Sequence, residues 1–267
     1  MLTALSLHSL SNVTPYYNQL NNYFDRIYVM TIRRATERHA KLQQVLKGLD
    51  FHFLYGADNK EFVVEDLIRQ GIYDPVKAKQ VHRYHKPFNM GMLGCTITHK
   101  MVYEDVVKHG YKKVLIFEDD VLPVEEGLKL FAQIVTELPS GWELVYFDYN
   151  KNVKRPAGGF IKQQFYHIQK ALGKLNLTSK TISNLYAKPY SKHLKIAGHH
   201  DFGSAYAITL GAAQKLVQLQ TPVAYWSDHL LAYACSNKIL NAYLTVPKLF
   251  IQESQTNKAA VGSYAEE

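Results

Sequence analysis

The chain has 267 residues, of which 47% are hydrophobic, and a formal net charge of +8 at pH 7. This composition is typical of a globular protein with an apolar core, and it excludes a wholly disordered chain. No apolar run approaches the roughly 20 residues of a membrane-spanning helix, so none is expected. The two cysteines, Cys95 and Cys235, are too few for a disulfide framework and lack the spacing of metal ligands.

The segment 1–15, MLTALSLHSLSNVTP, lacks a basic stretch before its apolar residues and is interrupted by serine and histidine. We therefore expect no cleaved secretory signal. Two thiols that stay reduced fit the cytoplasm, which is the location that the sequence favours.

The first elements form a strand, a helix and a second strand. The apolar stretch 26–32 (RIYVMTI) predicts a buried strand, and 51–55 predicts another. The helix between them has its apolar residues on one face: Leu42, Val45, Leu46 and Leu49. A strand–helix–strand order favours a parallel sheet.

Helices and strands alternate along the rest of the chain. Helices are expected at 62–69, 93–107 (closed by Gly110), 125–138, 212–219 and 226–235, and strands at 114–117, 143–148, 204–210 and 239–246. An irregular basic linker is expected through Pro75 and Pro87. The pattern predicts one α/β domain over 1–267, with a mixed, mostly parallel central sheet flanked by helices and a basic insertion at about 150–200.

Three acids stand at the end of the strand in KKVLIFEDDVLP: Glu118, Asp119 and Asp120. Three adjacent negative charges repel one another, so a positive group is expected among them. Ligands of open α/β sheets bind outside the carboxyl ends of the strands. Carboxylates suit Mn²⁺ or Mg²⁺, which commonly bind one or two carboxylates together with phosphates. The alternative is a solvated acidic turn.

Two other clusters of polar residues lie directly after a strand or at the start of a helix. Arg33, Arg34 and Arg38 come after the first strand, where a helix begins, and guanidinium groups and helix N-termini both suit phosphate. Asp228 and His229 lie in YWSDH at the start of an apolar helix. The alternatives are a solvated helix start for the arginines and capping or packing for Asp228 and His229.

Positive charge is concentrated in residues 151–200, which contain ten Lys and Arg and no Asp or Glu. Within this segment Phe165, Ile168, Leu172 and Leu175 share one helical face, near Lys162, Lys170 and Lys174. The pattern resembles a helix that lies on a membrane surface. We expect these lysines to bind an acidic acceptor and the segment to dock on an anionic membrane. The alternative is an insertion that packs on the core through the same apolar face.

Three blocks resemble glycosyltransferase family 25, the lipooligosaccharide-biosynthesis and collagen-galactosyltransferase group. They are RIYVMTIRRATERHAKL, MGMLGCTITHKMVYEDVVKHGYKKVLIFEDDVLP, and GSAYAITLGAAQKLV followed by VAYWSDHLLAYAC. The resemblance covers roughly residues 25–255 apart from the basic segment. It implies a GT-A type nucleotide-sugar-binding fold, a UDP-sugar donor (often UDP-galactose), a divalent metal and inversion at the anomeric carbon.

By position, the resemblance assigns Asp120 to the metal, Glu118 to the ribose or donor sugar, and Asp228 to the acceptor side. Departures from the family pattern are Thr31-Ile32 in the first strand, Asp58-Asn59 after the second, and Thr98 before His99. The expected donor-binding residues are Thr31, Arg33, Arg34, Arg38, Asp58, Glu118 and Asp119.

The expected function is inverting transfer of a hexose to a saccharide or glycolipid acceptor such as lipooligosaccharide. Galactose is the hexose expected first. Asp228 would deprotonate the acceptor, and His229 would be the reserve base or a third metal ligand. One rival is a nucleic-acid binder or phosphodiester enzyme, but the basic segment holds no recognisable nucleic-acid motif, so no such partner is expected. The other rival is an inactive membrane-surface relative.

Overall fold

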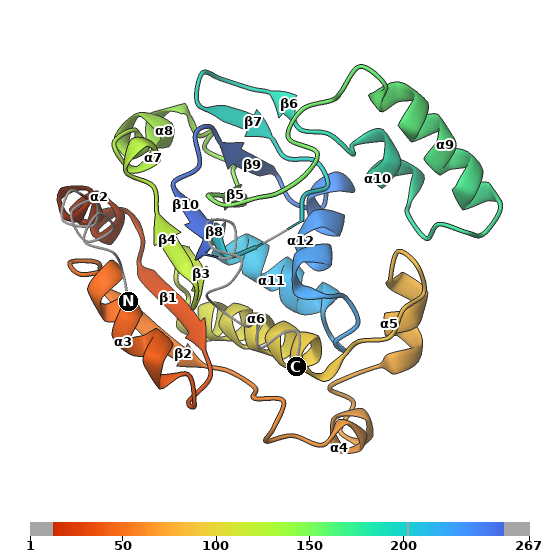
Figure 1. The fold of residues 1–267 in the computed structure, drawn as a ribbon, viewed down its shortest axis with the longest axis horizontal. Coiled ribbons are helices and arrows are strands. Elements are labelled where there is room, and N and C mark those ends of the chain that lie inside the picture. The colour runs from red at the N-terminus through yellow and green to blue at the C-terminus, as the bar shows by residue number, and fades with distance from the viewer. Residues whose placement is uncertain (1–12, 202, 254–267) are drawn as a thin grey trace.

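The computed structural model describes residues 13–201 and 203–253, so most of the N-terminal segment on which the signal expectation rests lies outside the described residues. An eight-stranded sheet, ordered β2-β1-β3-β8-β5-β9-β7-β6, forms the centre of the molecule (Figure 1). Its strands are β1 (Arg26–Thr31), β2 (Phe51–Tyr55), β3 (Lys113–Glu118), β5 (Leu144–Tyr146), β6 (Lys188–Pro189), β7 (Leu194–Ile196), β8 (Ala205–Thr209) and β9 (Ala242–Thr245). Pairing is parallel between β1 and β2, β1 and β3, and β5 and β9, whereas β8 and β7 run antiparallel to their neighbours. The predicted mixed α/β sheet is therefore confirmed.

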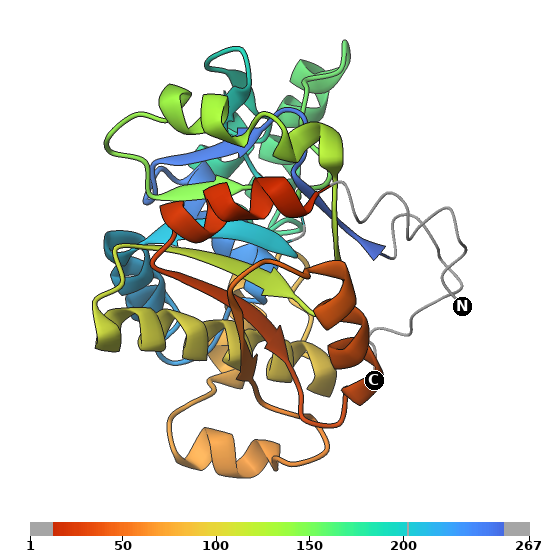
Figure 2. The same cartoon turned by 90° about the vertical axis from the view of Figure 1, so that its left-hand side faces the viewer.

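Helices cover both faces of this sheet (Figure 2). One face packs on α2 (Thr14–Tyr23), α3 (Thr36–Val45) and α8 (Phe131–Glu137), and the other on α6 (Met90–His109), α11 (Leu210–Leu219) and α12 (Ser227–Ser236). Strand β1 shows why both faces need cover, because Ile27 and Val29 enter one core and Tyr28 and Met30 the other. A strand that is buried on both faces has a continuous apolar sequence, and this property of the stretch 26–32 predicts the strand.

The helix predicted at 93–107 is longer than expected but ends where its cap predicts. This helix is α6, and the Asn89 side chain accepts a hydrogen bond from the Met92 N–H at its start. Gly110 follows its last turn in the left-handed conformation, with φ of 69°. Glycine adopts this conformation without steric cost, so the chain can turn back into β3 there.

Two predictions for helices were wrong in detail. The linker after residue 74 contains α5 (Pro75–Val81), because Asp74 caps the Lys77 N–H and proline is tolerated in a first helical turn. The helix expected at 125–138 is two helices, α7 (Glu125–Leu128) and α8. Between them the Leu130 N–H bonds the Gly127 carbonyl, three residues back, which interrupts the α-helical pattern.

The sequence patterns did not predict several short elements. Strands β4 (Val121–Pro123) and β10 (Phe250–Gln252) form a separate antiparallel pair. Within the basic segment, α9 (Gly159–Ala171) and α10 (Ser179–Ser183) are followed by β6 and β7, and β7 joins the sheet beside β9. The end of this segment is thus part of the sheet.

The remaining described helix is α4 (Val64–Arg69), and no described helix is both long and apolar enough to cross a bilayer.

Candidate active site

The carboxyl edge of β1 and β3 forms one wall of a pocket, here called the first pocket. Parallel pairing aligns Met30 with Glu118, so Thr31 and Asp119 emerge at the same edge. Helix α6 forms the opposite wall. The polar residues that line the pocket are Thr31, Arg38, Asn59, Cys95, Thr98, His99, Glu118, Asp119, Asp120 and Gln252. The three adjacent acids therefore share one pocket, but their surroundings differ.

Asp119 is held by the start of α3. Its Oδ2 accepts a hydrogen bond of 2.7 Å from Thr31 Oγ1, and its Oδ1 forms an ion pair with Arg38 Nη1. Thr31 Oγ1 also lies 3.0 Å from His39 Nε2. With both oxygens engaged, this carboxylate fixes the β1–α3 loop and neutralises Arg38.

Asp120 has one oxygen satisfied and one free among the described residues. Gln252 Nε2 donates to its Oδ2 over 2.9 Å, whereas its Oδ1 is buried without a hydrogen-bond partner. Burial, with the neighbouring negative charge of Glu118, raises the pKa of Asp120 to about 7. A buried polar atom without a partner calls for a missing one. A bound cation would supply it and would favour the charged carboxylate.

Gln252 was not predicted as a site residue. It reaches Asp120 because antiparallel pairing of β10 with β4 aligns Gln252 with Val121. No signal in the sequence indicates this contact, since the two strands are about 130 positions apart.

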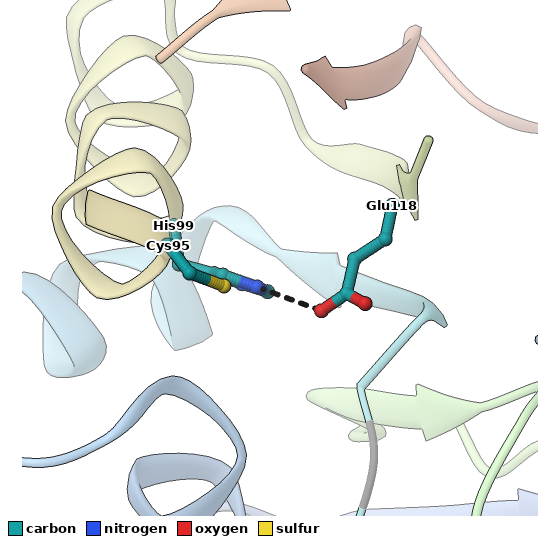
Figure 3. A group of neighbouring side chains, drawn as sticks. All are labelled: Cys95, His99 and Glu118. Carbon is teal, nitrogen blue, oxygen red and sulfur yellow. Dashed lines mark hydrogen bonds and ion pairs between the residues drawn. The ribbon is translucent and has the colours of Figure 1, made fainter. Parts of the chain in front are cut away.

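A second set of potential ligands faces the acids from α6. Figure 3 shows the side chains of Cys95 and His99 directed at Glu118. Their ligand atoms all lie within 4.8 Å of one another, and His99 Nε2 is 3.4 Å from Glu118 Oε1. The other ring nitrogen, Nδ1, lies 2.7 Å from the Tyr206 hydroxyl, which orients the imidazole. The spacing of four residues, which places Cys95 and His99 on one helical face, is the signal that could have found this pair.

The thiol of Cys95 is poorly suited to bind a metal at neutral pH. Burial and the nearby Glu118 raise its pKa well above the ordinary value, and only the thiolate is a good ligand. A site for a hard cation, built on Asp120 and Glu118, fits the surroundings better than a thiolate site.

The other predicted donor-binding residues lie beside the first pocket. Arg34 Nε bonds Asp58 Oδ2 over 2.7 Å, and its Nη2 bonds Asn59, which lines the pocket. Burial opposes ionisation of Asp58, but the Arg34 hydrogen bond and the Lys60 amide outweigh it and lower its pKa. Arg33 is exposed, with its guanidinium over the Tyr55 ring. Arg33, Arg34 and Asp58 are not among the described residues that line the first pocket.

Helix α12 begins between the first pocket and a second one. Ser227 Oγ lies 3.7 Å from Cys95 Sγ, which lines the first pocket. His229 lines the second pocket, and its ring stacks on Trp226 at 4.9 Å. Asp228 stands between them in the sequence and accepts the His229 N–H through Oδ1 over 2.8 Å. The structure thus places His229 in the second pocket, whereas Asp120 lines the first.

The second pocket lies between α12, the end of α5 and the segment that leads into α10. Its polar lining residues are Gln80, Arg83, Asn176, Thr178, Thr181, His199, Tyr225, His229 and Tyr233. Lys162, Lys170 and Lys174 are not among the described residues that line either pocket. Lys170 Nζ instead donates to Ser179 Oγ over 2.7 Å, and Lys162 and Lys174 are exposed.

Comparison with known families now explains the three sequence blocks. The model of glycosyltransferase family 25, described as an LPS biosynthesis protein, matches residues 24–231. The chain belongs to glycosyltransferase family 25. The match includes strand β3 and helix α6, which both line the first pocket, and the first residues of α12. The observed sheet is consistent with a GT-A type fold.

Similar curated proteins are much longer than this chain. A glycosyltransferase 25 family member of Aedes aegypti is 29% identical over 126 residues, covering 45% of this chain and 20% of the relative. Procollagen galactosyltransferase 2 of Homo sapiens is 23% identical over 205 residues, covering 73% of this chain and 27% of the relative. A probable inactive glycosyltransferase 25 family member 3 of Rattus norvegicus is 24% identical over 136 residues, covering 46% of this chain and 22% of the relative. The chain therefore spans about a quarter of the length of these relatives.

Proposed function

We propose that this chain is an inverting hexosyltransferase that moves a sugar from a UDP-sugar to a saccharide acceptor. Galactose is the expected hexose, and lipooligosaccharide or another surface glycan is the expected acceptor. Family membership supports glycosyl transfer. The observation that carries the proposal is the Asp120 oxygen that lies buried and unpartnered beside Glu118 at the carboxyl edge of the sheet.

The proposed cofactor is Mn²⁺ or Mg²⁺, held by Asp120 and Glu118. The residues fit a hard cation, because two carboxylates share the pocket and one oxygen lacks a partner. When bound, such a cation neutralises charge on the leaving diphosphate as a Lewis acid. Asp119 and Arg38 contribute differently, since their ion pair keeps the loop after β1 in place.

The acceptor hydroxyl requires a base, and Asp228 is our candidate. Its helix begins between the two pockets, with Ser227 against Cys95 and His229 in the second pocket. A carboxylate there could take the proton of a hydroxyl that reaches from the second pocket toward the first. His229 is the reserve candidate.

Activity with purified chain tests the proposal directly. We expect Mn²⁺-dependent turnover of one UDP-hexose from a panel that includes UDP-galactose, UDP-glucose and UDP-N-acetylhexosamines. EDTA should abolish that turnover. UDP-sugar hydrolysis without acceptor gives a readout that needs no knowledge of the acceptor. Absence of UDP binding and of hydrolysis with every donor would overturn the proposal in favour of an inactive relative.

Helix α9 supports a peripheral position on the cytoplasmic face of an anionic membrane. Its buried residues are Gly159 and Gln163, and Gln163 Nε2 donates to the Ile182 carbonyl over 2.5 Å. Phe165, Ile168 and Leu172, by contrast, are 54%, 57% and 64% exposed. Of the predicted apolar stripe only Leu175 is buried, so the stripe does not serve as a core-packing face. Exposed apolar residues among many cations fit the surface of an anionic bilayer.

A further inference from the structure

The second pocket contains buried polar atoms that no described residue satisfies. His199 is only 6% exposed, and its Nδ1 has no hydrogen-bond partner. The Nε of Arg83 is also buried without a partner. Both residues line the second pocket. Arg83 Nε is a buried donor without a partner, and His199 Nδ1 donates in one of the two tautomers of its ring. Together they indicate a ligand that accepts hydrogen bonds there.

The formal charge of the described residues that line this pocket is positive. The described residues that line it include the guanidinium of Arg83 and no Asp or Glu. Within the described part of the chain Arg83 forms no ion pair, and its guanidinium lies over the rings of Tyr84 and Tyr166 at 5.1 and 5.0 Å. These rings orient the guanidinium fork without neutralising it. Guanidinium forks bind carboxylate and phosphate oxygens through paired hydrogen bonds.

Rings gather around the same pocket. Tyr225 and Tyr233 line it, with their centroids 5.0 Å apart. His229 stacks on Trp226, whose centroid lies 4.3 Å from that of His82. Rings that present both an apolar face and a polar edge suit the faces of a sugar. The pocket therefore combines a site for an anion with surfaces for a saccharide.

We propose that the second pocket is the acceptor subsite and that it binds an oxyanion of an acidic saccharide, with Arg83 as the main contact and His199 as a hydrogen-bond partner. The inference rests on the proposed glycosyltransferase function. Helix α12 connects this subsite with the first pocket, because His229 lines the second pocket and Ser227 contacts Cys95, which lines the first. Asp228 lies between these two residues in the sequence. Phosphate and carboxylate share the required chemistry.

Calorimetric titration of the purified chain with three probes tests this assignment: a hexose 6-phosphate, a hexuronic acid and the neutral hexose. At least one charged probe should bind about tenfold or more tightly than the neutral sugar, and the tighter of the two identifies the oxyanion. R83Q should remove this preference, whereas R83K, which keeps the charge but loses the fork, should retain part of it. The matched control is K180Q, because Lys180 is an exposed cation on α10 that is not among the described residues lining the pocket.

UDP binding and donor hydrolysis, measured on the same variants, separate this inference from the proposed function. R83Q should leave UDP affinity and acceptor-free hydrolysis within about twofold of the parent chain, which also shows that the variant is folded. A charge preference that survives in R83Q, or that K180Q removes equally, would overturn the subsite. Equal affinity for charged and neutral sugars would overturn it as well. Absence of both UDP binding and donor hydrolysis in the parent chain would instead refute the proposed UDP-sugar-dependent transfer.

Discussion

The folded protein disfavours the charged form of the Asp120 carboxyl group, whereas a bound cation would favour it. Without a cation, burial and Glu118 penalise its charge; with one, the charge is required. We expect D120N to lower Mn²⁺-dependent turnover by at least about 10²-fold and to weaken UDP binding in Mn²⁺, because an amide is a poor ligand for a hard cation. The melting temperature should stay equal or rise, since Asn keeps an acceptor for Gln252 and loses the penalised charge.

The control for Asp120 is E126Q, an exposed acid on α7 that should keep full activity. Thermal melts and steady-state kinetics on both variants measure the expected changes in melting temperature and turnover. Full turnover of the parent chain in EDTA would contradict the assignment of Asp120 to a metal.

Asp228 is expected to act on the acceptor alone. D228N should lower turnover by roughly 10²-fold or more, the usual scale for loss of a general base, and leave UDP affinity nearly unchanged. Parallel measurements of transfer and of UDP binding distinguish the two sites. A collapse of UDP binding in D228N would move this residue to the donor or metal site.

At the scale of elements, α9 is the helix whose exposed face has no partner among the described residues. Cosedimentation with vesicles tests its proposed role. We expect binding that needs anionic lipid and weakens with salt, because surface charges are screened. Replacing Phe165 and Ile168 by Ser, or Lys162, Lys170 and Lys174 by Gln, should each reduce the bound fraction severalfold.

The matched control for α9 is a pair of exposed apolar residues elsewhere, Val63 and Val76, changed to Ser. These changes should not affect vesicle binding. Equal binding to neutral and anionic vesicles, or none to either, would contradict the membrane role and leave α9 a structural element.

At the scale of the whole molecule, buried histidines predict how stability depends on pH. His200 Nε2 accepts the Gly198 N–H over 2.9 Å, and Nδ1 donates to the Lys151 carbonyl over 3.0 Å, so the ring is held neutral. Burial lowers its pKa from 6.5 to about 4, and the effect outweighs the Lys151 hydrogen bond and Asp201, which favour the charged form. The unfolded chain then binds the extra proton between pH 6.5 and 4.

The free energy of unfolding should therefore decrease as pH falls through that window, by up to about 1.4 kcal/mol per pH unit from this one group. H200Q, which keeps a donor and an acceptor but cannot titrate, should reduce the slope measured by urea unfolding at several pH values. H52Q, at an exposed position of β2, is the control. An unchanged slope in H200Q would contradict the neutral state of the buried ring.

Local patterns in the sequence were sufficient to predict much of the fold and to single out some of the residues that line the candidate site. The apolar run of β1, the helical face of α3 and the stop at Gly110 each depend on neighbouring residues, whose periodicity and backbone preferences are readable without the fold. Parallel pairing then brought Thr31 to the predicted edge beside the acids, since both strands end there.

Tertiary structure alone decided how those side chains are used. Gln252 reaches Asp120 only through the pairing of β10 with β4, and Arg38 meets Asp119 across 81 positions of chain. Helix α9 turns Gln163 inward because carbonyl groups of α10 accept its amide, and it leaves most of the apolar stripe exposed. Periodicity alone leaves open whether this stripe faces the core or the surface. The second pocket joins α5, α10 and α12, and no local pattern encodes their meeting. Periodicity shows which face of a helix or strand is apolar. Which other element packs against that face depends on contacts between residues far apart in the chain.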